Sequence, residues 1–245
     1  MTALLTLRGL SKRFGGRIAV EGLDMELHQG VITALVGPNG AGKTTLFNMV
    51  TGNLPPDAGA VTLAGRTITG MAPHRVARLG IARSFQDLRL FTHMSVRDNV
   101  LASIERRAWL WQPGGGKARH DAAEAALDRT GLLPVARARA VDLSYAETKF
   151  LSLARIMATG ARIWLLDEPA SGLDFASRSR FVALLRGAVA EGVTICLIEH
   201  NLDVVTEISD RIAFLDQGRK LAEGDPANII QNPDLRAIYF GERRG

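Results

Sequence analysis

A glycine-rich segment at residues 37–45 has a spacing of residue types suited to chemistry. It reads, in order, Gly37, Pro38, Asn39, Gly40, Ala41, Gly42, Lys43, Thr44 and Thr45, which fits the pattern G-x-x-x-x-G-K-[ST]. The glycines let successive backbone N–H groups turn inward around an anion. Lys43 can then reach the β and γ phosphates of a nucleotide, and the Thr44 hydroxyl can ligate Mg²⁺. The segment therefore predicts a nucleotide-binding phosphate loop.

The segments on both sides of this loop have the patterns that such a loop requires. Residues 31–36 form a short apolar run, typical of a strand buried on both faces of a parallel sheet. Residues 43–51 have a helical pattern that stops at Gly52, a residue suited to a helix C-terminus. The helix would point the positive end of its dipole at the anion. A glycine-rich turn without a ligand is the alternative, and the lysine and threonine in this context argue against it.

Two adjacent carboxylates end another apolar run. Residues 163–166 are followed directly by Asp167 and Glu168. On its own, such a strand end is as well explained by solvation at a sheet edge. Together with Lys43 and Thr44 it predicts that Asp167 holds Mg²⁺ through its water shell, and that Glu168 polarises a water for attack on the γ phosphate.

The composition indicates a globular protein with a substantial core. The chain has 245 residues, 47% of them hydrophobic, which allows one large α/β domain or two smaller ones. Its apolar runs are far shorter than the roughly 20 residues that span a bilayer. The N-terminus lacks the pattern of a secretory signal, and Cys196 is the single cysteine, so no internal disulfide is possible. These features predict a cytoplasmic protein.

The net charge of +5 comes from 25 arginines and 5 lysines against 25 acidic residues. The basic residues are scattered, and aromatic residues make up only 6% of the chain. The interleaved basic and aromatic platform of single-strand binders is not evident. We therefore expect solvated helix faces and one phosphate site, and no nucleic-acid partner.

The order of the elements is typical of an α/β protein. Strands are expected at 4–7 and 22–27, a hairpin at 61–68 turning at Ala64-Gly65, and helices from about 73 to 160, interrupted by a flexible, exposed loop at 112–116. Strands return at 162–167 and 193–198 around a helix at 176–190, which is the βαβ rhythm of a parallel sheet. The sheet is thus interrupted by a helical insertion and then resumed.

Further motifs make the chain resemble the ATP-binding subunits of ABC transporters over nearly its whole length. Gln86 stands at the family's Q-loop position, Leu143-Ser144 at its signature, residues 170–174 at its D-loop, and His200 at its switch histidine. The resemblance implies an α/β P-loop NTPase (RecA-like) core with an N-terminal antiparallel β subdomain and an inserted α-helical subdomain. We expect one ABC ATPase domain over 1–245, with the core and β subdomain in 1–86 and 161–220, the helical subdomain in 87–160 and a C-terminal tail in 221–245.

The resemblance also implies roles for individual residues. Phe14 stands where the family stacks an aromatic ring on adenine. Gln86 would touch both Mg²⁺ and the attacking water, and His200 would donate a hydrogen bond to the γ phosphate or that water. Asp174 would lie at the seam between two subunits. The expected catalytic residues are Glu168, His200, Gln86 and Lys43, the metal ligands Thr44, Gln86 and Asp167, and the nucleotide contacts residues 37–45 with Phe14, Ser144 and Asp174.

The signature departs from the family's usual Leu-Ser-Gly-Gly-Gln. It reads Leu143, Ser144, Tyr145, Ala146 and Glu147. Ala146 adds a Cβ where close approach matters, and Glu147 places a negative charge near phosphate. Ser144 and Glu147 also have the spacing of a capping box, which alone would justify them as a helix start. We hypothesise that the composite site using this signature hydrolyses ATP more slowly than its partner site.

The resemblance implies ATP and Mg²⁺ as cofactors, a second ABC ATPase subunit, two transmembrane permease subunits and, indirectly, a periplasmic solute-binding protein. The expected location is the cytoplasmic face of the inner membrane. Residues 83–91 and the tail from 223 to 242 resemble importers of branched-chain or hydrophobic amino acids. Urea or amide importers, lipopolysaccharide exporters, and soluble ABC-type ATPases of DNA repair or translation are the alternatives. The soluble class typically has coiled-coil insertions or tandem cassettes, whereas the motifs here indicate one cassette with a short helical lobe.

Overall fold

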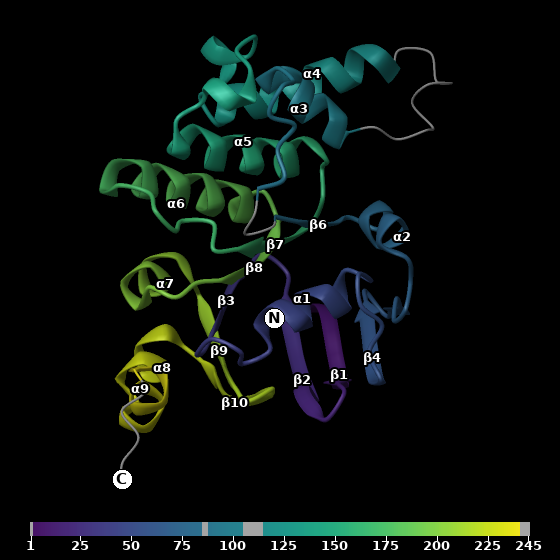
Figure 1. Ribbon diagram of the computed structural model, residues 1–245, viewed down its shortest axis with the longest axis vertical. Coiled ribbons are helices and arrows are strands. Elements are labelled where there is room, and N and C mark those ends of the chain that lie inside the picture. Colours follow the sequence, from purple (N-terminus) through teal and green to yellow (C-terminus); the bar gives the residue numbers. More distant parts are fainter. Residues whose placement is uncertain (1, 85–87, 105–114, 241–245) are drawn as a thin grey trace.

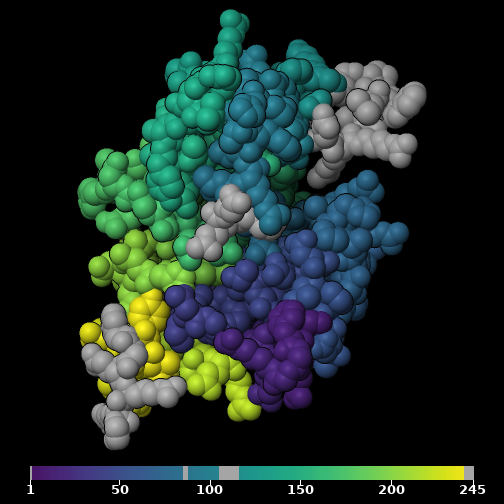
Figure 2. Space-filling model, in the orientation of Figure 1, coloured from purple at the N-terminus to yellow at the C-terminus, as the bar shows by residue number. Residues whose placement is uncertain are grey.

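The computed structural model describes residues 2–84, 88–104 and 115–240. Among these residues the strands form a four-stranded sheet and a six-stranded sheet, and the helices cover them (Figure 1). In the space-filling view the helical middle of the chain forms one end of the molecule, and the N-terminal sheet lies toward the other end (Figure 2). No helix in the described ranges is long and apolar enough to span a membrane.

The six-stranded sheet is the core of the protein. Its order is β10-β9-β3-β8-β7-β6, in which β9 to β6 are parallel and β10 is an antiparallel edge. Its strands are β3 (Ile32–Val36), β6 (Ile81–Arg83), β7 (Ile163–Asp167), β8 (Thr194–Ile198), β9 (Arg211–Asp216) and β10 (Arg219–Gly224). All residues of β3, β7 and β8 are buried, as expected for strands covered on both faces.

Alternate residues of these strands enter two different hydrophobic clusters. Ile32, Ala34 and Val36 pack with the helices of the middle and C-terminal parts of the chain, whereas Leu35 packs with the first helix and the N-terminal sheet. This follows from the two-residue period of a strand. The core sheet is therefore a central layer with a separate apolar contact on each face.

The antiparallel sheet has the order β2-β1-β4-β5. Its strands are β1 (Ala3–Phe14), β2 (Arg17–His28), β4 (Ala58–Leu63) and β5 (Arg66–Thr67). The hairpin turning at Ala64-Gly65 is confirmed. The strands expected at 4–7 and 22–27 are too short, because register shifts at Gly9 and Gly22 interrupt the alternation while pairing continues to Phe14 and Arg17.

The helices are α1 (Lys43–Val50), α2 (Pro73–Arg78), α3 (Val96–Ser103), α4 (Gly115–Arg129), α5 (Tyr145–Ala158), α6 (Phe175–Ala190), α7 (Leu202–Ile208), α8 (Pro226–Gln231) and α9 (Pro233–Phe240). Helices α3, α4 and α5 stack beyond one edge of the core sheet (Figure 1). Short 3₁₀ turns at Leu133–Val135 and Ala140–Asp142 join α4 to α5.

Two expectations for the middle of the chain are wrong. The segment from 73 to 160 is not helical throughout, because Ile81–Arg83 form strand β6, which pairs in parallel with β7. Three residues are too few for a strand pattern to stand out between helices. Of the loop expected at 112–116, residues 112–114 lie outside the described residues, and Gly115 and Gly116 belong to α4 instead.

Candidate nucleotide-binding site

The glycine-rich loop connects the end of β3 to the start of α1, as its sequence predicts. Gly37, Gly40 and Gly42 have φ values of 147°, 81° and 101°, a region that favours glycine. A Cβ on Gly37 would lie 1.9 Å from the Leu215 carbonyl oxygen, and one on Gly42 would lie 2.4 Å from that of Ala19. Backbone geometry and close packing thus both require glycine at positions 37 and 42.

Lys43 turns its side chain back into this loop. Its Nζ donates to the carbonyl oxygens of Gly37 at 2.6 Å and Pro38 at 2.9 Å, and only 6% of the residue is exposed. Burial lowers the pKa of Lys43, and the nearby carboxylates of Glu168 and Asp167 oppose this shift. The ammonium is therefore held inside the loop at the place where an anion would sit.

A cavity of about 490 Å³ brings most of the predicted site residues together. Its lining comprises Phe14, Arg17, Ala19, residues 39–45, Asp167, Glu168, Ile198 and His200. The Phe14 ring is half exposed, with the Lys12 ammonium 5.9 Å from its centroid. An aromatic residue, the phosphate loop from Asn39 to Thr45 and two carboxylate residues thus line one space. Arg17 and Ala19 were not singled out from the sequence, because the β1–β2 hairpin brings them there only through the fold.

Asp167 is paired with an arginine from the neighbouring strand. Arg83 on β6 lies 3.6 Å from the Asp167 carboxylate, and both side chains are nearly fully buried. Burial raises the pKa of Asp167, while the Arg83 charge opposes the increase. Arg83 also donates to the Asn48 side chain and lies over the Phe47 ring. Arg83 therefore connects Asp167 to α1. The sequence does not predict this role, because it does not predict strand β6.

Glu168 and His200 meet at the ends of β7 and β8. The Nε2 of His200 lies 2.9 Å from Oε1 of Glu168. The Glu168 backbone is in the left-handed region, with φ of 48°, and its N–H donates to the Ile198 carbonyl at 2.9 Å. The Tyr239 hydroxyl, on the C-terminal helix α9, donates a hydrogen bond to the His200 carbonyl oxygen. Both predicted side chains therefore lie at the same edge of the parallel sheet.

Glu199 is a buried carboxyl group beside this pair. Only 3% of it is exposed, and its Oε1 accepts a hydrogen bond from the backbone N–H of Ala170 at 2.9 Å. Burial raises the pKa of Glu199 to about 7, against the opposing effect of the backbone hydrogen bonds from Ala170 and His200. Glu199 thus anchors the segment that follows Glu168.

Within the described part of the chain, four predicted residues do not line the cavity: Gly37, Pro38, Ser144 and Asp174. Ser144 caps α5, where the capping box with Glu147 is confirmed by hydrogen bonds of 3.3 Å and 2.8 Å in the two directions. Asp174 caps α6 through the Ser177 N–H at 2.8 Å. Gln86 lies outside the described residues. Ser144 and Asp174 therefore lie at helix N-termini outside this cavity.

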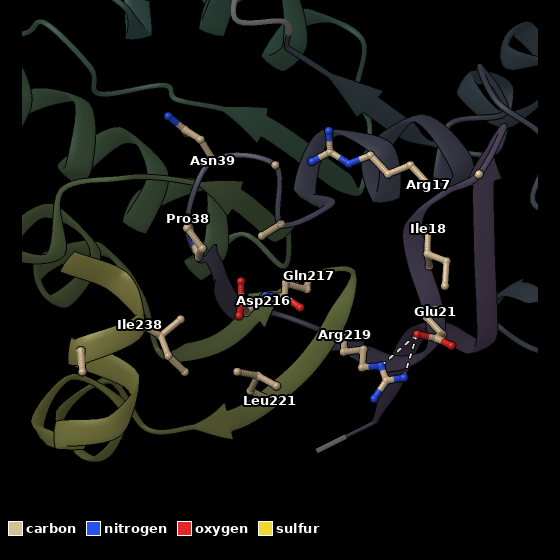
Figure 3. Close-up of a pocket in the computed structure, with 14 residues that line it drawn as sticks. Arg17, Ile18, Glu21, Pro38, Asn39, Asp216, Gln217, Arg219, Leu221 and Ile238 are labelled. Atoms are coloured by element: carbon tan, nitrogen blue, oxygen red, sulfur yellow. Dashed lines mark hydrogen bonds and ion pairs between the residues drawn. The ribbon is translucent and has the colours of Figure 1, made fainter. Parts of the chain in front are cut away.

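A larger cavity, of about 1060 Å³, lies on the other side of the phosphate loop. Figure 3 shows Pro38 and Asn39 at its upper edge and Asp216 and Gln217 near its centre. The ion pair between Arg219 and Glu21 at 2.9 Å closes one side by joining β10 to β2. Lys43, Asp167 and Glu168 do not line it. The smaller cavity is the candidate nucleotide site because Lys43, Asp167, Glu168 and His200 line it.

The donor set suits Mg²⁺ bound together with phosphates. No cluster of three or more His, Cys, Asp or Glu side chains capable of holding a metal is found over residues 2–84, 88–104 and 115–240. The same cavity does hold the Thr44 hydroxyl and the buried Asp167 carboxylate. Mg²⁺ commonly takes one or two carboxylates, and phosphate and water oxygens complete its shell. The residues present therefore fit this ion.

A phosphate loop between a buried strand and a helix, facing two carboxylates at the end of a parallel strand, defines a P-loop NTPase. Residues 20–171 match the sequence profile of the ABC transporter family. The chain belongs to this family, and it is an ABC-type ATPase.

Relatives cover nearly the whole length of the chain. It is 40% identical over 252 residues to the high-affinity branched-chain amino acid transport ATP-binding protein LivG of Salmonella typhimurium, with 98% of each chain covered. It is 38% identical over 250 residues to BraF, of the same description, from Pseudomonas aeruginosa, also with 98% of each covered.

Solved structures have the same fold. An ATP-binding cassette of an ABC transporter in its ADP conformation matches with a TM-score of 0.89 and 27% identity, covering 98% of this chain and 100% of that one. A nucleotide-free cassette matches with a TM-score of 0.88 and 27% identity. The expected α/β core with its antiparallel and helical additions is thereby confirmed.

Proposed function

We propose that this chain hydrolyses ATP to power the import of branched-chain or other hydrophobic amino acids through membrane permease partners. The observation that carries the proposal is the cavity that unites Lys43, Asp167, Glu168 and His200 behind the Phe14 ring. The names of the relatives support the substrate class. The ATPase itself need not touch the solute, so the substrate rests on this likeness.

The proposed mechanism assigns one task to each side chain. Phe14 stacks on adenine, and the backbone N–H groups of residues 37–45 surround the phosphates. Lys43 leaves its two carbonyl partners for the β and γ phosphates. Glu168 orients a water and takes its proton, while His200, 2.9 Å away, donates to the γ phosphate or to that water. Gln86 completes the set as a ligand and sensor.

Mg²⁺ would be held by Thr44, by Gln86 and, through water, by Asp167. When bound, it neutralises charge on the phosphate oxygens. Arg83 keeps Asp167 in place through their buried pair.

The proposed working unit is a head-to-tail dimer of ABC ATPase subunits. Ser144 and Asp174 cap their helices outside the chain's own nucleotide cavity, and Tyr145 between them on the surface is 54% exposed. A second subunit would present its own signature to this cavity, so that closure completes the site and hydrolysis reopens it. Both an identical and a different ABC ATPase subunit fit this arrangement as the partner.

A groove of about 540 Å³ beside the Q-loop segment suits a permease partner. Its lining includes Val76 of α2, Ser84 and Leu88 on the two sides of residues 85–87, Phe91, and Ile156 of α5. A cytoplasmic segment of a permease bound here would contact the chain on both sides of residues 85–87. We therefore propose that the chain acts at the cytoplasmic face of the inner membrane, with a periplasmic solute-binding protein on the far side.

Reconstitution into vesicles tests the proposed substrate. The chain is co-expressed with the permease and binding-protein genes that neighbour it, and ATP hydrolysis is measured with leucine, phenylalanine, urea, an aliphatic amide or lipopolysaccharide. We expect stimulation by the hydrophobic amino acids. Stimulation by urea, amide or lipopolysaccharide alone would assign one of the alternative transport systems, and recovery without permeases would favour a soluble ATPase.

A further inference from the structure

Two side chains on one face of α5, near its start, hydrogen-bond to the segment that carries Glu168. Lys149 lies one turn after Tyr145, so both side chains project on the same side of the helix. The Lys149 ammonium is 5.6 Å from the centre of the Tyr145 ring. Only 5% of Lys149 is exposed, which is unusual for a lysine and calls for a specific partner.

The partner of Lys149 is the backbone of the proposed catalytic base. Its Nζ donates to the carbonyl oxygen of Glu168 at 2.9 Å. Hydrogen bonds from an ionised donor are stronger than neutral ones, and burial protects this one from water. The bond fixes the peptide that follows Glu168 and with it the direction in which the Glu168 side chain leaves the backbone.

Tyr145 holds the other end of the same turn. Its hydroxyl donates to the carbonyl oxygen of Ser171 at 3.0 Å, and its ring covers Gly172 so closely that a Cβ there would lie 2.8 Å from the ring. The turn from Glu168 to Gly172 is therefore held at both ends by two side chains of one helix.

The backbone at Glu168 needs such support. Its φ of 48° lies in the left-handed region, which is strained for a non-glycine residue and persists only where surrounding contacts enforce it. The Lys149 bond, the Glu168 N–H bond to Ile198 and the Glu199 bond to Ala170 are those contacts. Among them, Lys149 alone belongs to the helical part of the chain.

We propose that Lys149, assisted by Tyr145, is a positioning residue for Glu168, and that the signature helix thereby controls the base of its own chain. The inference rests on the proposed role of Glu168. In the proposed dimer, the start of α5 meets the nucleotide bound by the partner subunit. Nucleotide binding at that site would fix the position of α5, and α5 would in turn fix the position of the Glu168 side chain. The two nucleotide sites would then communicate through contacts within one chain.

The test uses the full-length chain with its transporter partners and compares Lys149→Met with Lys149→Arg. We expect Lys149→Met to lower kcat for ATP about tenfold or more while KM changes less than about twofold, because a displaced base impairs the reaction without removing a nucleotide contact. Lys149→Arg, which can still donate to the carbonyl, should restore most of kcat. Lys117→Met, on the exposed surface of α4, is the matched control.

Two further variants separate the possible outcomes. Glu168→Gln reports on the base itself. If Glu168→Gln is inactive while Lys149→Met keeps the parent kcat, the inference is wrong and the proposed function stands; if Glu168→Gln is fully active, the proposed role of Glu168 is wrong. If Lys149→Met does not fold, Tyr145→Phe decides, since it removes only an exposed hydroxyl. We expect about a threefold loss of kcat at constant KM, and a parent-like kcat would overturn the proposal.

Discussion

At the scale of single residues, the Glu199 carboxyl gives the fold a dependence on pH. Its pKa rises from the ordinary value of 4.5 to about 7 because the group is buried. Between these values the folded chain retains a proton that the unfolded chain releases. The free energy of unfolding therefore falls as pH rises from about 4.5 to 7. Above pH 7 the loss in free energy of unfolding reaches its full value of about 3 kcal/mol.

Replacement of Glu199 by Gln should remove this dependence, since an amide can accept the Ala170 N–H bond without ionising. We expect Glu199→Gln to be about as stable as the parent at pH 5 and about 2 to 3 kcal/mol more stable at pH 8. Urea unfolding at both values measures the difference. Equal pH dependence in parent and variant would show that Glu199 is ionised in the folded chain.

The buried pair of Arg83 and Asp167 permits a second prediction at this scale. Arg83→Met leaves the Asp167 carboxyl buried without its compensating charge, which should lower the free energy of unfolding by about 3 kcal/mol. The double variant Arg83→Met with Asp167→Asn should recover part of this loss, because no buried charge remains. Denaturant unfolding in the absence of nucleotide measures both. A double variant less stable than Arg83→Met would contradict the pairing.

At the scale of elements, the start of α5 combines a sound helix cap with an altered signature. Because glutamine also completes a capping box, Glu147→Gln removes the negative charge and keeps the cap. We expect Ala146→Gly combined with Glu147→Gln to raise the ATPase rate of the assembled dimer several-fold, by removing about 1 kcal/mol of unfavourable contact with phosphate.

Steady-state ATP hydrolysis by the purified complex measures this effect. The matched control is Ser144→Ala, which breaks the cap and should cost about 1 kcal/mol of stability. No gain in rate from the double variant would rule out a slow composite site as the consequence of this signature.

The same scale shows what the sequence predicts well. Strands β3, β7 and β8 and helix α6 lie within a residue or two of their expected ranges, because each is a continuous apolar run or a long helical pattern bounded by glycine or a capping residue. Strand β6 was missed because it has only three residues and one neighbour in the sheet. The ends of β1 and β2 were missed because their register shifts break the alternation.

The candidate site divides in a similar way. The phosphate loop, the Asp167-Glu168 strand end and His200 could be placed from local patterns, and the structure brings them together. Arg83 and Lys149 could not, since their partners Asp167 and Glu168 are 84 and 19 residues away in sequence and only the fold creates these contacts. Arg17 likewise reaches the cavity only through the fold. A lysine among the apolar positions of α5 is the one local signal available.

At the scale of the whole molecule, the chain presents its signature away from its own nucleotide cavity. We expect Glu168→Gln to bind ATP with Mg²⁺ and accumulate as a closed dimer, because binding drives closure and the missing base prevents the reaction that reopens it. Hydrolysis should fall by about 100-fold or more. Light scattering with and without nucleotide measures the dimer.

The control for this experiment is Glu207→Gln, an exposed position on α7, which should hydrolyse ATP as the parent does. Rapid turnover by Glu168→Gln would contradict its assignment as base. A monomer at saturating nucleotide would instead contradict the head-to-tail arrangement, unless a different subunit is the obligatory partner, which adding the co-purified second ATPase decides.

The left-handed backbone of Glu168 has a consequence for how this protein can change over time. Glycine or asparagine would fit that φ of 48° with less strain, so selection for stability alone would replace the glutamate there. If Glu168 is the proposed base, selection for turnover and selection for stability would favour different residues at this single position. A lineage released from the need to hydrolyse ATP should lose this residue early. The protein would then gain thermal stability as it lost its ATPase activity.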